Sequence, residues 1–326
     1  MSGPQRTNRR MQPLSRTIFP VLLTGFAAAC LFGLRSDLAQ VSFAPLARSW
    51  DLVALAAFCS LLNYMLRIVR WHRYLARLGH SMPIAFVGLT YVAGFAFTVS
   101  PGKVGEMARA RYYSRFGVSL PDVAGAFFVE RLMDIIAVMA LAVLILAAIP
   151  RYQFALWITG VLIVVALLIL AVLPWTRIAG AIERNARLPR ALLHLGLGAT
   201  RALDAARSLL SPIPLLWGFA LGLFAWGLEG VGLYTLASVF PTVHLGLAGG
   251  IGIYAVAVLV GAISFLPGGL GSTEAVMTAL LSTHGYSVGE AFLITIACRI
   301  VTLWFAVGIG WIAVFALRNR MVPAVS

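Results

Sequence analysis

The apolar residues of this chain fall in long, uninterrupted runs instead of the alternating pattern of an amphipathic strand. Runs of this length predict helices that cross a membrane, because about 20 apolar residues are needed to span the hydrocarbon core. The continuity also argues against a β-barrel, whose strands alternate with a period of two. Eight apolar segments are expected to enter the membrane, at 17–34, 52–69, 84–100, 122–149, 153–173, 213–240, 247–266 and 289–317.

The composition supports the same class of protein. Of the 326 residues, 61% are hydrophobic and only 11% are charged, which leaves too little polar surface to cover a soluble globule of this size. We therefore expect an all-α polytopic integral membrane protein.

Two short motifs rich in proline and glycine repeat each other inside apolar stretches. Residues 101–106 read Pro-Gly-Lys-Val-Gly-Glu, and residues 267–271 read Pro-Gly-Gly-Leu-Gly, with Glu274 close behind. Downstream, Arg131 and Arg299 occupy matching positions in two apolar helices. The pattern predicts a duplicated membrane unit, which is an architecture typical of transporters. The two copies are expected to cover about 84–149 and 247–317.

The net charge of +14 comes almost entirely from arginines, and their positions predict the topology. Basic loops of membrane proteins stay on the cytoplasmic side. This rule makes residues 1–16 and 319–326 cytoplasmic tails and residues 175–211 a basic cytoplasmic loop. The assignments hold only if each Pro-Gly motif enters the membrane and returns to the side from which it came.

The resulting prediction is a single membrane domain over residues 17–318, with about six full spans and two re-entrant helix hairpins. Three full spans separate the two motifs, so the repeats are expected to be inverted. The charged limb 106–116 of the first hairpin would be shallow or would line a wet cavity.

Each Pro-Gly motif breaks its helix, because proline lacks an amide donor and glycine tolerates tight turns. Backbone amides beside a new helix start can hold a phosphate, which makes the motif glycines candidate ligand contacts. A plain tight turn between two helices is the alternative. The glycines concerned are Gly102, Gly105, Gly268, Gly269 and Gly271.

Charged residues near the motifs are candidates for contact with a polar head group. The acids that follow the motifs, Glu106 and Glu274, would bind a proton or a cationic part of the cargo, with simple helix capping as the alternative. An anionic head group would be held by four cations, which are Lys103, Arg109, Arg131 and Arg299.

A further group of charges lies in the span after the first motif. Glu130, Arg131 and Asp134 are close enough to share neighbouring surfaces of one helix. Two acids and one base cannot all be comfortably charged, so either one acid is protonated or another cation, such as Arg109 or Arg299, joins them. A purely structural ion pair is an equally strong interpretation.

Two more polar features stand out in apolar surroundings. Arg67, Arg70 and Trp71 occur where the second span is expected to meet the cytoplasm, and we interpret them as an interfacial anchor that contacts lipid phosphates. Glu229 lies alone in its apolar segment and is a candidate proton site.

No motif of a known enzyme class is found. The chain has no GxxxxGK[ST] sequence for nucleotide hydrolysis and no GxSxG or HExxH motif. Its three cysteines and five histidines lack metal-ligand spacing. We expect neither enzymatic activity nor a metal or cofactor. Nucleic-acid binding is not needed to explain the charge, because basic amphipathic segments bind anionic lipid.

The combination of these motifs resembles a known family. The pieces that match are Asn63-Tyr64 to Arg67, Arg70-Trp71, Pro101 to Glu106 with Arg109, Glu130-Arg131 with Asp134, Pro267 to Gly271 with Glu274, and Arg299. Together they resemble the membrane-embedded, flippase-like domain of bacterial lysylphosphatidylglycerol synthase, the multiple peptide resistance factor. The resemblance covers about residues 17 to 318.

The resemblance implies a protein of the bacterial inner membrane that moves a phospholipid or related polar lipid between leaflets. The soluble aminoacyltransferase domain of the synthase has no counterpart in this sequence, so we do not expect lysyl transfer. The arginine-rich interior suggests a cargo with an anionic or phosphate-bearing head group. The alternative is a non-transporting partner or scaffold of a glycosyltransferase or lipid-modifying enzyme in a hopanoid or glycolipid pathway. Either role is compatible with a homo-oligomer or a complex with a pathway enzyme.

Overall fold

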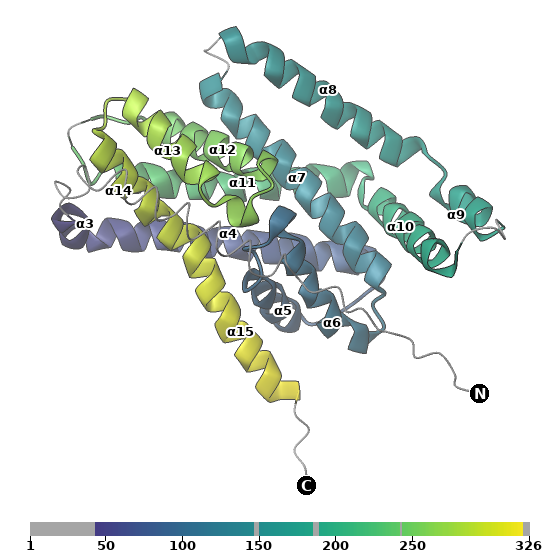
Figure 1. Cartoon of the computed structure of the whole chain (residues 1–326). Coiled ribbons are helices and arrows are strands. Elements are labelled where there is room, and N and C mark those ends of the chain that lie inside the picture. The colour runs from purple at the N-terminus through teal and green to yellow at the C-terminus, as the bar shows by residue number, and fades with distance from the viewer. Residues whose placement is uncertain (1–42, 147–149, 185–188, 242, 322–326) are drawn as a thin grey trace, which may run out of the picture. The chain divides into compact units, whose positions relative to one another are not determined.

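The computed structural model describes residues 43–146, 150–184, 189–241 and 243–321, and all regular structure within them is helical. The expected first span, 17–34, and the basic tail 1–16 lie outside these residues, as does most of the tail 319–326. Figure 1 shows the course of the helices, coloured along the chain.

Except for the helix over 190–209, the longer helices coincide with the apolar runs of the sequence, and short 3₁₀ segments mark both Pro-Gly motifs. In chain order the elements are α3 (Ala44–Arg48), α4 (Trp50–Arg77), α5 (Ile84–Phe95), η1 (Pro101–Arg109), α6 (Ala110–Tyr113), η2 (Ser114–Phe116), α7 (Leu120–Leu146), α8 (Pro150–Val172), α9 (Trp175–Glu183), α10 (Arg190–Leu209), α11 (Pro212–Ala237), α12 (Leu247–Ile263), η3 (Pro267–Gly269), α13 (Ser272–Thr283), α14 (Val288–Arg299), η4 (Ile300–Trp304) and α15 (Phe305–Met321).

Three helices of the described chain are long and apolar enough to cross a membrane: α4, α11 and the continuous helix 288–318, which joins α14 to α15 through a π-helical turn. The bent pair α8 and α9 would make a fourth span if the two count as one. Helix α7 has 27 residues but carries Glu130, Arg131 and Asp134 near its centre. The prediction of a helical membrane protein is therefore confirmed, whereas the count of six spans stays a prediction.

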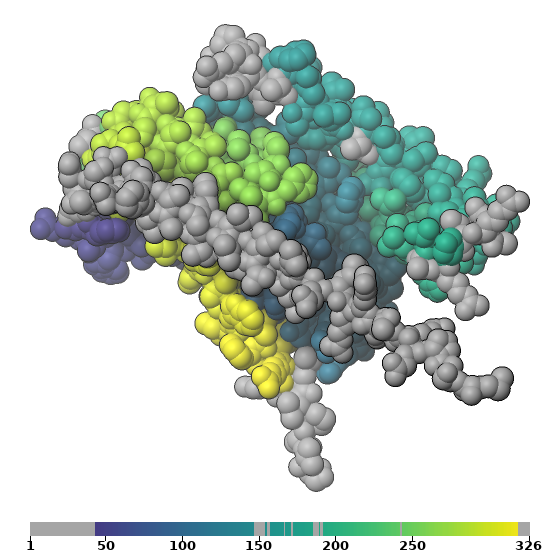
Figure 2. All heavy atoms as spheres, viewed as in Figure 1, coloured from purple at the N-terminus to yellow at the C-terminus, as the bar shows by residue number. Residues whose placement is uncertain are grey.

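Outward-facing side chains support the membrane assignment. On α8, Phe154 and Trp157 are about three-quarters exposed, at 74% and 75%, and most other large side chains of this helix are also open to the surroundings. The surface of α8 is visible in teal in Figure 2. A helix that is apolar on its exposed side requires lipid or a partner in place of water.

The two short apolar helices that precede the motifs do not reach across a bilayer as α-helices of their own. Helix α5 has 12 residues and α12 has 17, so at 1.5 Å per residue they measure roughly 18 and 26 Å, against a hydrocarbon core of about 30 Å. Each ends in a Pro-Gly turn with left-handed backbone. Gly102 and Lys103 have φ of 59° and 57°, and Gly268 and Gly269 have φ of 63° and 66°.

The packing of the two motif regions is reciprocal. Helix α5 packs against α15, which follows the second motif, and α12 packs against α7, which follows the first. Helices α4 and α11, which precede α5 and α12, pack along each other. The two motif turns η1 and η3 also contact each other, so chain segments about 166 residues apart meet at one point.

The segment 175–211 is more structured than the basic loop that the sequence predicts. It forms helices α9 and α10, and α10 packs along α7. Gly125 of α7 makes this approach close, because a Cβ at its position would lie 2.5 Å from the carbonyl oxygen of Ala202. Small residues on both helices allow their backbones to meet, which charge counting along the sequence cannot reveal.

Replacing Gly310 with alanine should destabilise the protein by about 1–3 kcal/mol, because the new methyl group would lie 2.8 Å from the backbone carbonyl carbon of Phe95 and close to Ala96. Gly308 provides a matched control two residues away, since a Cβ there meets nothing within 4 Å. Thermal unfolding of both variants in detergent micelles measures the difference. Equal unfolding temperatures would show that α5 and α15 are not in close contact.

Candidate functional site

A cavity of about 290 Å³ lies where the two motif turns meet. Its wall is formed by side chains from α4, α5, α7, α11, α12 and the helix 288–318, together with both motifs. Ten of the residues singled out in the sequence line it: Arg67, Gly102, Lys103, Glu106, Arg131, Asp134, Glu229, Gly268, Gly269 and Arg299.

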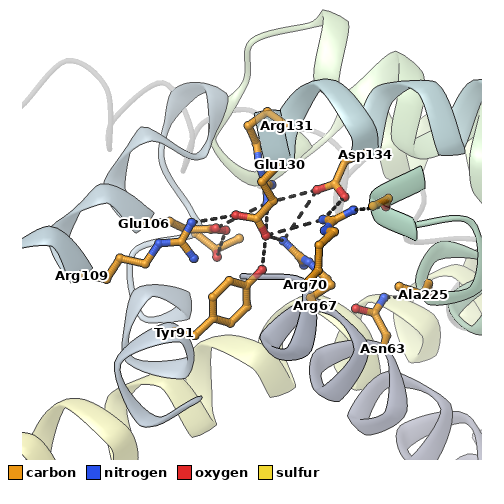
Figure 3. A network of polar contacts seen from close by, with 12 residues as sticks. Asn63, Arg67, Arg70, Tyr91, Glu106, Arg109, Glu130, Arg131, Asp134 and Ala225 are labelled. Carbon is orange, nitrogen blue, oxygen red and sulfur yellow. Dashed lines mark hydrogen bonds and ion pairs between the residues drawn. The ribbon is translucent and has the colours of Figure 1, made fainter. Parts of the chain in front are cut away.

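Glu130 is the centre of a buried charge network beside this cavity (Figure 3). Arg109 donates from Nη2 to Glu130 Oε2 over 2.7 Å, and the Tyr91 hydroxyl donates to Oε1. Arg131 Nη2 lies 3.1 Å from the same Oε1. Arg67 and Arg70 approach that oxygen at 3.7 and 3.6 Å. A fully buried carboxylate is thus matched by several cations, as burial of a charge requires.

Asp134 is one helical turn further along α7 and shares these cations. Arg70 Nη2 donates to Asp134 Oδ1 over 2.5 Å, and Arg131 Nη2 is 3.0 Å from Oδ2. Arg67 lies 3.8 Å from Oδ2. Of the two predicted recruits, Arg109 does join the Glu130 group, whereas Arg299 pairs elsewhere, with Glu274.

Aromatic rings surround the buried guanidinium groups. The Arg109 guanidinium lies 3.6 Å from the centroid of the Trp71 ring and 4.6 Å from that of Tyr91. Arg67 lies between 5.5 and 5.8 Å from the rings of Tyr91, Phe95 and Trp226. Arginine stacks on aromatic faces better than lysine, because its guanidinium is planar and weakly hydrated.

Arg299 ties down the second motif. Its Nε donates to Glu274 Oε1 over 2.6 Å, and its Nη2 donates to the carbonyl oxygen of Gly268 over 2.7 Å. The other carboxylate oxygen of Glu274 accepts from the amide of Gly271 over 2.6 Å, so this acid also caps α13. Arg299 and Glu274 therefore fix the second Pro-Gly turn through the Gly268 carbonyl and the Gly271 amide.

The first motif has the equivalent residues in a looser arrangement. Glu274 and Arg299 each follow their counterparts Glu106 and Arg131 by 168 positions. Arg131 Nη2, however, lies 3.9 Å from Glu106 Oε2 and is nearer to acids of α7. Glu106 instead accepts a hydrogen bond of 2.7 Å from the Thr98 hydroxyl. The same residue pair is thus closed at one motif and open at the other.

Amides of the two motifs have hydrogen-bond partners inside their own turns, which removes them from the phosphate site that the sequence suggested. The amides of Lys103 and Gly105 donate to the Ser100 carbonyl and hydroxyl. Those of Gly269 and Gly271 donate to the Leu266 carbonyl and to Glu274. These donors already have acceptors within the turns, because the backbone amides of a tight turn bond to nearby groups of the same turn.

The interfacial interpretation of Arg67, Arg70 and Trp71 is wrong. Arg70 and Trp71 are 0% exposed and Arg67 is 5% exposed, all within the interior of the described helices. The Trp71 indole donates to the Tyr113 hydroxyl over 2.9 Å. The error arises because an arginine beside a tryptophan at the end of a span fits an interface as well as a paired interior site.

Several predicted contacts lie behind the cavity wall and support it. Arg109 and Glu130 are fully buried and bind each other. Gly105 and Gly271 belong to the turns, and Glu274 is in the first turn of α13. None of these five residues is among those that line the cavity.

Helices α4 and α11 carry, at the cavity wall or behind it, polar residues to which the sequence analysis gave no role. The Ser60 hydroxyl donates to Glu229 Oε2 over 2.8 Å, so Glu229 is not alone. Asn63 donates to the Ala225 carbonyl over 3.0 Å, while its Oδ1 has no hydrogen-bond partner among the described residues. Ser60, Asn63 and Arg67 recur at helical spacing, which is the one signal that could have placed them on a common face.

No group of three or more His, Cys, Asp or Glu side chains is arranged to hold a metal ion within the described ranges. The charged side chains that line the cavity can bind a ligand electrostatically, and its carboxylates and lysine can also exchange a proton. The described part of the chain defines a polytopic helical membrane protein with an internal charged cavity.

Comparison with known proteins assigns this architecture to a family. Residues 18–310 match the model of the lysylphosphatidylglycerol synthase TM region. The chain belongs to this family, as the motifs predict. Two relatives from Methanothermobacter thermautotrophicus, both described as UPF0104 membrane proteins, are 25% and 26% identical to it. The alignments cover 72% and 80% of this chain and 74% and 82% of the relatives.

Proposed function

We propose that this protein is a lipid translocase, which moves a phospholipid or related polar lipid between the leaflets of the bacterial inner membrane. The observation that carries the proposal is the cavity, which combines a charged interior with an apolar side. Its charged groups come from the first Pro-Gly motif and from α4, α7, α11 and α14, while the second motif contributes Gly268 and Gly269 to the wall. A transporter that moves only the polar head through protein needs such a lined path, while the acyl chains stay in the bilayer.

The apolar side of the cavity lies between α7 and the end of α12. Ile135 of α7 lines it with 39% of its surface exposed, and Phe265 and Leu266, after α12, are 73% and 43% exposed. Exposed apolar side chains at the edge of a charged cavity suit an amphiphile better than a small polar solute. They favour a lipid that enters sideways from the membrane.

The repeated architecture supports a transport mechanism. The reciprocal packing of α5 with α15 and of α12 with α7 is what an inverted repeat with two re-entrant hairpins would produce. The closed Arg299–Glu274 pair and the open Arg131–Glu106 pair fit a transporter with one gate shut. The proposal includes six spans and cytoplasmic termini, and it assigns the protein a transport role without catalysis.

The test is lipid exchange in liposomes that contain the purified protein and a fluorescent phospholipid in both leaflets. Dithionite added outside should bleach more than the outer half of the signal with the wild-type protein. In the double variant Arg131→Ala, Arg299→Ala this excess should fall at least about tenfold, because charged hydrogen bonds worth about 1.5–3 kcal/mol each are lost at the cavity.

The matched control is the double variant Arg111→Ala, Arg318→Ala, which removes two exposed arginines outside the cavity and should translocate normally. Both variants must elute as folded protein before the assay. Bleaching limited to the outer half for wild type, across several head groups and with an imposed proton gradient, would contradict the proposal. The scaffold role, with α9 and α10 as the binding element for an enzyme partner, would then be favoured.

A further inference from the structure

Lys103 differs from every other cation that lines the cavity. It is the only lysine in the chain, whose other basic side chains are arginines and histidines. Arg67, Arg131 and Arg299 each have a carboxylate within 4 Å. No ion pair or hydrogen bond joins the Lys103 ammonium to any described residue, and its contact is the face of the Trp226 ring, 5.3 Å from the centroid.

The backbone conformation at Lys103 is unfavourable for any residue with a side chain. Its φ of 57° is in the left-handed region, which costs a non-glycine residue roughly 1–2 kcal/mol. The equivalent residue of the second motif is Gly269, with φ of 66°. A lysine therefore occupies a position at which glycine would fold more easily.

Glu229 is the matching exception among the acids of the cavity. Glu106 and Asp134 each lie within 4 Å of an arginine, whereas Glu229 has no cation within that distance among the described residues. It is 3% exposed and lies one helical turn from Trp226 on α11. The Trp226 indole nitrogen is buried and lacks a hydrogen-bond partner in the described chain.

The cavity thus holds one unpaired cation and one unpaired carboxylate, with the face and the free donor of a tryptophan close to both. A ligand with a single charge would satisfy one of the two groups and leave the other unpaired. A ligand with an anionic and a cationic group would satisfy both. The free indole N–H can donate to an anionic oxygen beside Lys103, whose ammonium lies over the face of the same ring.

We propose that Lys103, Trp226 and Glu229 form a site for a zwitterionic phospholipid head group, with the phosphate at Lys103 and the Trp226 indole N–H and the ammonium at Glu229. The inference rests on the proposed function and specifies its cargo. It narrows the expected phosphate-bearing head group to one that also carries an amine. Arg67 and Arg131, already paired with acids, would contribute long-range attraction for the phosphate.

Binding to purified protein in detergent tests the site without any transport step. Short-chain lipids with identical acyl chains and either a phosphoethanolamine or a phosphoglycerol head group are titrated while the unfolding temperature is followed. The wild type should bind the phosphoethanolamine lipid about tenfold more tightly. Glu229→Gln, which keeps an acceptor for Ser60, should abolish this preference. Lys103→Gly should weaken the binding of both lipids at least about tenfold, while it relieves the strain of the left-handed backbone.

The single lysine provides a second readout. An amine-reactive reagent should modify Lys103 in wild type and in Glu229→Gln, as found by peptide mass spectrometry. A short-chain phosphocholine lipid, which is zwitterionic but has no reactive amine, should protect Lys103 in wild type. Equal or tighter binding of the phosphoglycerol lipid by wild type would overturn the proposal. So would full wild-type behaviour of the double variant Lys103→Glu, Glu229→Lys, which would show that the two side chains serve each other.

The two proposals fail separately. If the selective binding is found but no lipid crosses the liposome membrane, the head-group site is supported and the translocase function is contradicted. If lipids cross but bind without preference for an amine, the translocase function is supported and the zwitterionic site is contradicted.

Discussion

Replacing Glu130 with alanine is expected to lower the free energy of unfolding by about 3–5 kcal/mol, the largest stability loss that we predict for any single charge. The side chain is fully buried, and Arg109 donates to it over 2.7 Å. Its removal leaves Arg109 without its carboxylate partner and takes one of the nearby carboxylates away from Arg131. Buried cations without a matching acid are costly because they have been taken out of water. Urea unfolding in mild detergent measures the change.

Glu130→Gln shows whether the charge or the shape of Glu130 matters, and Glu183→Ala serves as a control. Glu130→Gln keeps the volume and one acceptor, so it should lose a smaller part of the stability. Glu183→Ala removes an exposed acid of α9 and should change stability by less than about 0.5 kcal/mol. A loss below 1 kcal/mol for Glu130→Ala would mean that the arginines of this network are not held by Glu130.

Arg299→Ala is expected to release the second Pro-Gly turn and to reduce translocation at least about tenfold by itself. Arg299 makes charged hydrogen bonds to Glu274 and to the Gly268 carbonyl, and each is worth about 1.5–3 kcal/mol. Without them the amides of residues 266–274 should exchange with deuterium faster by at least about tenfold. Exchange measured by mass spectrometry and the liposome assay report on the turn and on the function separately.

The comparison with Arg131→Ala makes the prediction specific. In this structure Arg131 is 3.9 Å from Glu106, so its loss should change amide exchange at the first turn, 99–106, much less than Arg299→Ala changes the second. Arg318→Ala, which removes an exposed arginine of α15, should leave both turns unchanged. Equal release of the two turns would show that the closed and open pairs do not mark two different gates.

The membrane character and the helices of this protein could be predicted from the sequence because they depend on local properties. Apolar runs long enough to span a bilayer become helices in lipid, where every backbone amide must bond within its own segment. Helices α4, α11 and 288–318 follow these runs closely. The Pro-Gly motifs mark the breaks for an equally local reason, since proline lacks an amide donor and glycine accepts the left-handed backbone found at Gly102 and Gly268.

Most pairings between charges far apart in the sequence were decided by the tertiary structure. Arg70 and Trp71 could face lipid head groups or the interior with the same helical pattern, and only the approach of α7 shows that Arg70 binds Asp134, 64 positions away. Ser60 and Glu229 meet across 169 positions. Lys103 and Glu229 stand out only once every other charge of the cavity has a partner. Sequence by itself determined a family of helical membrane proteins with two interrupted helices. Which ions remain free to bind a ligand depends on contacts between distant segments, because in lipid an apolar helix surface packs on protein or on acyl chains with similar energy.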